Sequence, residues 1–133
     1  MKYLLILISL LTGSAFAADY NYTDQWNDDE SSDGLLTIQI PLRVYDVTNT
    51  ELIGAAVDVT IRNNWKIEAY SKDSIVASYK KSRIEISADK QYLTIKEVPL
   101  YTQPKKKWLL SLRKHIENRI KYHHYMRKIA KES

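Results

Sequence analysis

The sequence predicts an α+β fold, in which an antiparallel meander of four or five strands packs against one short helix and one long C-terminal helix. Three observations predict this fold. A helix-capping motif begins at Thr48, four short alternating segments follow between residues 65 and 96, and a long helical pattern covers residues 105 to about 130. Connections this short permit only antiparallel pairing of neighbouring segments, and such a sheet needs a cover on its apolar face.

The first 17 residues have the pattern of a secretion signal. Lys2 carries a positive charge, an apolar run extends from Tyr3 to Leu11, and an A-x-A cleavage pattern ends at Ala17. The run holds roughly ten residues, whereas a helix needs about twenty to cross a bilayer. We therefore expect cleavage after Ala17, a periplasmic or secreted protein, and no transmembrane segment in the mature chain. A short buried helix is the alternative.

Residues 18–34 are acidic and include no basic residue. Their mutual repulsion and sparse apolar surface predict a flexible acidic arm. Two alternatives are open: a solvated linker without a role, and an arm that folds back on the basic C-terminal helix. The acidic residues are Asp19, Asp24, Asp28, Asp29, Glu30 and Asp33.

Residues 35–47 contain the first predicted strand. Apolar and polar side chains alternate up to Pro41, which has no N–H to donate to a neighbouring strand. This pattern predicts an edge strand, followed by a second extended stretch at residues 42–45.

Thr48 and Glu51 have the spacing of a capping box, which predicts that a helix begins there. The helix would end at Asn63. Residues 50–62 also fit a strand, because β-branched side chains alternate with polar ones and Gly54 lowers helix propensity. The cap favours the helix, and the strand is the alternative.

Four strands are predicted between residues 65 and 96, with turns near residues 71–73, 80–82 and 88–90. The last helix would cover this meander with an apolar stripe that includes Leu109 and Ile120. The predicted domain covers residues 35–120, and its core-packing residues are Trp65, Ile67, Ile84, Ile86, Ile95, Trp108, Leu112 and Ile116.

Beyond Ile120 the apolar stripe weakens, because His123 and Arg127 occupy the positions where it should continue. We therefore treat residues 121–133 as a basic helical extension whose last turns project past the sheet.

A series of aromatic and aliphatic residues runs through residues 48 to about 120 in a recognisable order. These residues are Trp65 and Ile67, Ile75 and Ala77, Ile84 and Ile86, Tyr92 and Ile95, and then Trp108, Leu112 and Ile116. In this order the segment resembles a group of small bacterial envelope proteins of uncharacterised function, many of them lipoproteins. The resemblance implies a fold and a location and implies no chemistry. The lipid-acceptor cysteine of that group is absent, since the chain has no cysteine.

The chain carries no catalytic signature. Thiol chemistry is excluded without cysteine, and there is no G-x-S-x-G motif or glycine-rich phosphate loop. His115, His123 and His124 lack the spacing of a helical zinc site, so we expect no metal and no cofactor. A carboxylate dyad remains open, because pairs of acids cannot be recognised from sequence. These features predict an exported, non-catalytic binding or envelope-maintenance module.

The strongest feature outside the core is the positive charge of the C-terminal helix, where ten lysine or arginine residues stand against one acid, Glu117, between residues 105 and 131. A positively charged flank on a helix attracts an anionic lipid surface or an acidic protein. The alternative function is therefore peripheral binding to such a surface or partner through this helix. A solvated face is the simpler interpretation. Nucleic acid is not expected, because no reading motif is present. The candidate binding residues are Lys106, Arg113, Lys114, Lys121, Lys128 and Lys131.

Overall fold

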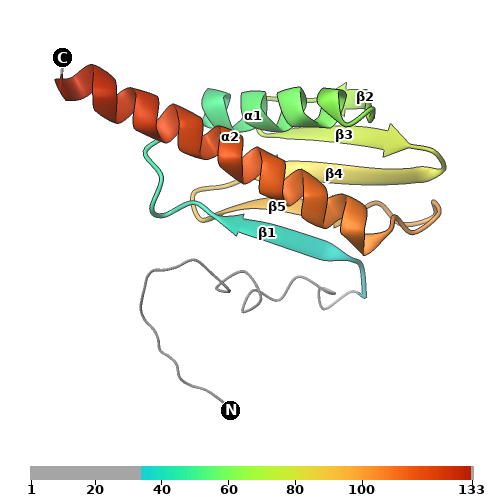
Figure 1. Cartoon of the computed structure of the whole chain (residues 1–133). Coiled ribbons are helices and arrows are strands. Elements are labelled where there is room, and N and C mark those ends of the chain that lie inside the picture. Colours follow the sequence, from blue (N-terminus) through green and yellow to red (C-terminus); the bar gives the residue numbers. More distant parts are fainter. Residues whose placement is uncertain (1–33, 133) are drawn as a thin grey trace, which may run out of the picture.

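The computed structural model describes residues 34–132, so the predicted signal peptide and the acidic arm up to residue 33 lie outside the described residues. The described chain forms five strands and two helices (Figure 1). In chain order these are β1 (Thr37–Pro41), α1 (Asn49–Arg62), β2 (Lys66–Tyr70), β3 (Ser74–Tyr79), β4 (Ser82–Ala88), β5 (Tyr92–Glu97) and α2 (Lys106–Glu132).

All five strands belong to one sheet with the order β1-β5-β4-β3-β2, and each neighbouring pair is antiparallel. Strands β2 to β5 are therefore the predicted meander. The first strand lies at the sheet edge beside β5, as Pro41 predicted, because a residue without an N–H is tolerated there. The predicted α+β fold class is confirmed.

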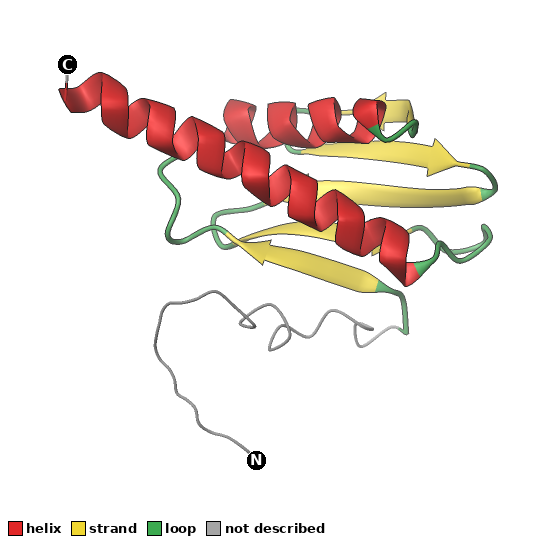
Figure 2. Cartoon of the chain, in the orientation of Figure 1, coloured by secondary structure: helices red, strands yellow, loops and turns green. Residues whose placement is uncertain are grey.

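Both helices lie on the same face of the sheet (Figure 2). Helix α1 packs over β2, β3 and β4, while α2 contacts β1 and α1. The register aligns Ile38 with Ile95, Ile95 with Ile86, and Ile86 with Ile75, so one apolar row crosses four strands beneath the helices. The opposite face carries polar side chains such as Lys66 and Glu85, which are exposed.

Residues 49–62 are a helix, and the strand alternative is wrong. The Thr48 hydroxyl accepts from the Glu51 N–H at 3.1 Å, and the Glu51 carboxylate accepts from the Thr48 N–H at 2.8 Å. This capping box satisfies backbone donors that a helix start otherwise leaves open. The buried residues follow helical spacing, and Asn64 with φ of 69° turns the chain away into β2. The buried residues are Leu52, Ala55, Ala56, Val59 and Thr60.

The predicted second extended stretch at residues 42–45 is wrong, because these residues form a turn. The Tyr45 N–H donates to the Leu42 carbonyl at 3.0 Å, and the Leu42 side chain is buried in the core. The turn redirects the chain from β1 towards the start of α1. It also brings the Tyr45 hydroxyl to the Glu117 carboxylate, to which it donates at 2.8 Å.

Six of the eight predicted core residues are buried: Trp65, Ile84, Ile86, Ile95, Leu112 and Ile116. The other two, Ile67 and Trp108, are half-buried and pack against this core. Ile67 lies on β2, the edge strand opposite β1, where no further strand of the described sheet shields it. The Trp108 ring stands edge-on to Trp65 and Tyr79, with centroid distances of 6.4 and 5.1 Å. It therefore packs at the periphery of the core, next to these two rings.

No helix within residues 34–132 combines the length and the apolar character needed to cross a membrane.

Candidate functional site

The C-terminal turns of α2 are held in place by polar contacts. The His124 Nδ1 accepts from the Asp46 N–H at 2.9 Å, and Lys131 Nζ donates to the Asp46 carboxylate at 2.8 Å. The Arg127 guanidinium donates to the Glu51 carboxylate and, at 3.2 Å, to the Asp46 carbonyl. We call these five residues the anchor cluster. They join α2 to the β1–α1 connection and to the first turn of α1.

Hydrogen bonds and charge pairing shift the pKa values of three groups in the anchor cluster. The Lys131 ammonium lowers the pKa of Asp46, with Arg127 and His124 contributing. The Thr48 N–H and the Arg127 guanidinium lower the pKa of Glu51, and Glu51 in turn raises the pKa of Arg127. Asp46 and Lys131 are exposed, and Glu51, His124 and Arg127 are half-buried. Because solvent reaches each pair and screens it, the cluster orients the helix end more than it stabilises the fold.

Two of the predicted binding residues do not lie free on the solvent side of α2. Arg113 is 8% exposed, because its position on the helix is next to the apolar stripe that faces the sheet. Lys131 is paired with Asp46. The last turns, which were expected only to project past the sheet, are attached to the β1–α1 connection through positions 123, 124, 127 and 131.

The other predicted binding residues are exposed on the solvent side of α2. Lys114, Lys121 and Lys128 recur every seven residues, which places them in a row along one flank of a helix. No salt bridge joins these three lysines to a carboxylate in the described part of the chain. We call them the lysine row. Lys106 is also exposed, about two turns before the row begins.

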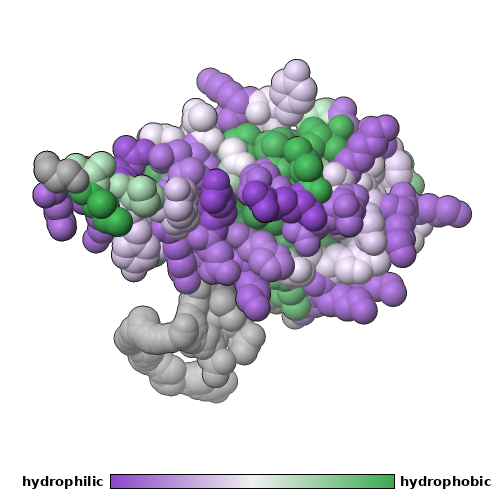
Figure 3. Space-filling model, turned by 45° about the horizontal axis from the view of Figure 1, so that its top comes forward, coloured by the Kyte–Doolittle hydropathy of each residue, from purple (hydrophilic) through white to green (hydrophobic). Residues whose placement is uncertain are grey.

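An exposed apolar stripe lies beside the lysine row in the last turns of α2. Tyr122, Tyr125, Met126 and Ile129 follow the spacing i, i+3, i+4, i+7 of one helix face, and their exposed fractions lie between 46% and 59%. Hydrophobic surface is visible at the C-terminal end of the molecule, next to hydrophilic surface (Figure 3). We call these four residues the apolar tip. The apolar stripe was expected to weaken beyond Ile120, although the spacing of these four residues is a detectable signal for a second apolar face.

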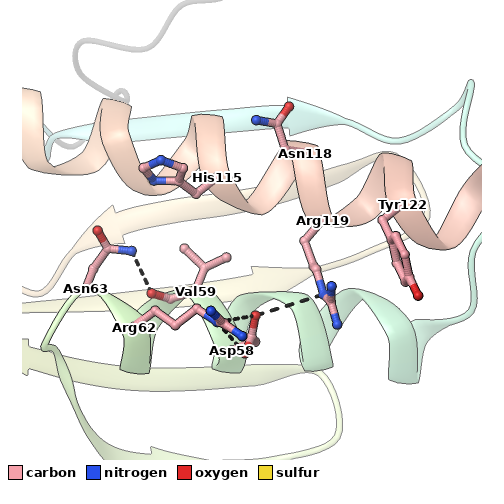
Figure 4. A pocket seen from close by; sticks show the side chains of 8 residues that line it. All are labelled: Asp58, Val59, Arg62, Asn63, His115, Asn118, Arg119 and Tyr122. Atoms are coloured by element: carbon pink, nitrogen blue, oxygen red, sulfur yellow. Dashed lines mark hydrogen bonds and ion pairs between the residues drawn. The ribbon is translucent and has the colours of Figure 1, made fainter.

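A groove of about 480 Å³ lies between α1 and α2 (Figure 4). The Asp58 carboxylate accepts from Arg62 Nε at 3.0 Å and lies 3.9 Å from Arg119 Nε, while the Arg119 guanidinium stacks on Tyr122 at 4.7 Å. A carboxylate that is already paired with two guanidinium groups is a poor general base. Because it holds two guanidinium groups and one carboxylate, the groove is a cationic recess, and it adjoins the apolar tip through Tyr122. The full lining is Asp58, Val59, Arg62, Asn63, His115, Asn118, Arg119 and Tyr122.

The three histidines are not brought together. His115 lines the groove, His124 accepts from Asp46, and the His123 Nδ1 lies 3.9 Å from the Glu51 carboxylate. Within residues 34–132, no three His, Cys, Asp or Glu side chains are grouped so that they could hold a metal ion.

The lowered pKa values predict that acid releases the end of α2. Both carboxyl groups have folded-state pKa values below their ordinary values of 4.5 for Glu51 and 3.8 for Asp46. Their charged contacts are therefore fully present above these ordinary values and are lost as the pH falls through the lowered ones. We expect backbone NMR signals of residues 123–131 to move below pH 4, while those of residues 109–116 stay in place.

A Glu51→Gln variant at pH 7 provides the matched control. Glutamine still completes a capping box but cannot pair ionically with Arg127. This variant should reproduce part of the acid effect at residues 123–131. If these signals are unchanged both in the variant and at pH 3, the anchor cluster does not hold the C-terminal end of α2 in place.

No protein-family model matches this sequence, and no curated protein matches it. The resemblance to small bacterial envelope proteins stays a prediction.

Proposed function

We propose that this chain is an exported, non-catalytic binding module that holds a polyanionic partner against the outer side of α2. The proposal depends on one observation: positive charges on the two sides of this helix differ in whether a carboxylate neutralises them. On the inner side Arg127 and Lys131 are neutralised by Glu51 and Asp46. On the outer side the lysine row has no carboxylate partner within residues 34–132.

Unneutralised lysines in a row suit a partner with repeating negative charge. Each lysine near an anionic surface contributes about 1 kcal/mol, and the attraction falls off within a Debye length. At the groove, Arg119 of α2 and Arg62 of α1 share one carboxylate, Asp58, so these three residues leave a net positive charge beside α2. The remaining parts of the proposal have sequence support: the signal pattern of residues 1–17 for export, and the missing catalytic motifs for a binding role.

The proposal predicts a localised, salt-sensitive footprint on α2. Dextran sulfate serves as a polyanionic probe, and neutral dextran as its control. Amine acetylation of the protein, followed by mass spectrometry, measures the protection of each lysine. We expect dextran sulfate to protect Lys114, Lys121 and Lys128 at about 10 mM salt and to lose this effect at about 1 M, where the Debye length shrinks from about 30 Å to about 3 Å.

Lysines away from α2 are the internal reference for this experiment. Lys66, Lys72 and Lys90 are exposed on the sheet and its turns, and they should stay reactive in the presence of dextran sulfate. Equal protection of both groups, or protection by neutral dextran, would contradict a binding surface on α2.

A further inference from the structure

The amphipathic pattern of α2 changes sides after Ile120. Up to that residue the apolar stripe faces the sheet, with Leu112, Ile116 and Ile120 at most 1% exposed. In the following turns the inward positions are polar and reach Asp46 and Glu51. The outward positions are apolar and form the apolar tip. The last turns therefore face the domain with charge and face solvent with apolar surface.

This arrangement is the reverse of what a helix end needs for solubility alone. A helix end that served only to cap the domain would turn its polar side chains outward. Here the anchor cluster uses the charged side chains and fixes the rotation of the helix, so that the apolar tip must point away from the domain. Contiguous apolar surface that is held outward marks an interaction site.

The side chains around the apolar tip match an anionic bilayer. Lys121 and Lys128 flank the tip, and long lysine side chains can lie on apolar surface while their ammonium groups reach phosphate. Tyr122 and Tyr125 have an apolar ring and a polar hydroxyl, which suits the boundary between head groups and acyl chains. A basic flank beside an apolar stripe is the pattern of a helix that lies in a membrane interface.

The position of the tip in the fold leaves it accessible. The C-terminal end of α2 extends beyond the edge of the sheet and of α1 (Figure 1). A flat surface can therefore approach the last turns without meeting the strands.

We propose that the apolar tip inserts into the interface of an anionic lipid bilayer while the lysine row lies at the level of the lipid phosphates. This inference rests on the proposed function, because it identifies the polyanionic partner as a lipid surface. In the bound state Tyr125, Met126 and Ile129 leave water, and the anchor cluster keeps the domain above the membrane plane.

The first test measures partitioning into vesicles of phosphatidylglycerol and phosphatidylcholine, with pure phosphatidylcholine vesicles as the comparison. The variant Tyr125→Gln with Ile129→Gln removes apolar surface from the tip and leaves every lysine in place. A matched control, Tyr70→Gln with Ile61→Gln, removes side chains that are 84% and 56% exposed elsewhere on the domain. We expect the tip variant to bind anionic vesicles roughly tenfold less tightly or worse and the control to bind as the unaltered chain does.

The second test reports insertion directly. The chain has no cysteine, so Met126→Cys and Ile61→Cys each create a single labelling site. With a nitrobenzoxadiazole label, we expect the fluorescence at position 126 to rise and shift to the blue on anionic vesicles and the fluorescence at position 61 to stay constant.

The outcomes separate this inference from the proposed function. If the protein binds dextran sulfate through α2 but not anionic vesicles, the partner is an acidic macromolecule of another class and the inference is overturned. Vesicle binding without a change in the label at position 126 overturns insertion while the polyanion site stands. Loss of the dextran sulfate footprint on α2 overturns the proposed function itself.

Discussion

Replacing Leu112 and Ile116 together with alanine is expected to leave the protein largely unfolded at 25 °C. Both side chains are at most 1% exposed and lie between α2 and the sheet. Each truncation of a buried leucine or isoleucine costs about 2 to 5 kcal/mol, since it removes apolar contacts and leaves a cavity. Their sum is comparable to the whole stability of a domain of this size, about 5 to 15 kcal/mol.

The measurement is thermal unfolding followed by circular dichroism, with each single variant beside the double one. A loss of 1 kcal/mol lowers the melting temperature of a small domain by about 4 to 8 °C, so each single variant should melt at least about 8 °C below the unaltered chain. The control is Met126→Ala with Ile129→Ala, on the same helix but in the exposed apolar tip. Exposed substitutions usually change stability by no more than about 0.5 kcal/mol each.

A melting temperature unchanged by the double core substitution would mean that α2 does not cover the sheet. The fold described above would then be wrong at its main contact, and so would the placement of the lysine row and the apolar tip. The control variant removes a similar amount of apolar surface from the same helix without changing the core. It therefore distinguishes the loss of core packing from a general effect of alanine substitutions in α2.

Reversing the charge of the lysine row is expected to abolish binding to polyanions. The variant combines Lys114→Glu, Lys121→Glu and Lys128→Glu. Losing three favourable charges removes about 3 kcal/mol of attraction, which is at least about a hundredfold in the binding constant, and the new carboxylates add repulsion. Equilibrium binding to dextran sulfate and to anionic vesicles at low salt measures the effect.

The matched control for this variant is Lys66→Glu, Lys72→Glu and Lys90→Glu. It produces the same change in net charge on residues of the sheet and its turns, all of them exposed. If binding depends only on the net charge of +4, both variants lose it equally. If the outer side of α2 is the binding surface, the control keeps most of its affinity. Equal losses would therefore contradict a localised site.

Features that depend on neighbouring residues could be predicted from the sequence. The capping box at Thr48 and Glu51 marks the start of α1, because its two hydrogen bonds form within one helical turn. Alternating side chains and short turns identify the meander, since a period of two residues places Ile84 and Ile86 on the same face. The apolar stripe up to Ile120 identifies the side of α2 that covers the sheet.

The turn at residues 42–45 shows where this reasoning fails. Alternation continues past Pro41 in the sequence and favours an extended stretch there. The structure bends the chain, because a buried Leu42 and a bond from Tyr45 to Glu117 require the connection to pass beside α2. Glu117 is 72 residues away, and such a partner leaves no mark in the local pattern.

Local patterns in the chain were enough to predict the helices, the meander, the covered face of the sheet and the basic character of the last helix. Which charges on that helix are neutralised and which are exposed depends on contacts between distant segments. Asp46 and Lys131 are 85 residues apart in the chain, and they meet because the connection between β1 and α1, which includes Asp46, passes beside the C-terminal turns of α2 (Figure 1). Helical periodicity states which side chains share a face, but the partner of each face depends on contacts between segments that are remote in sequence.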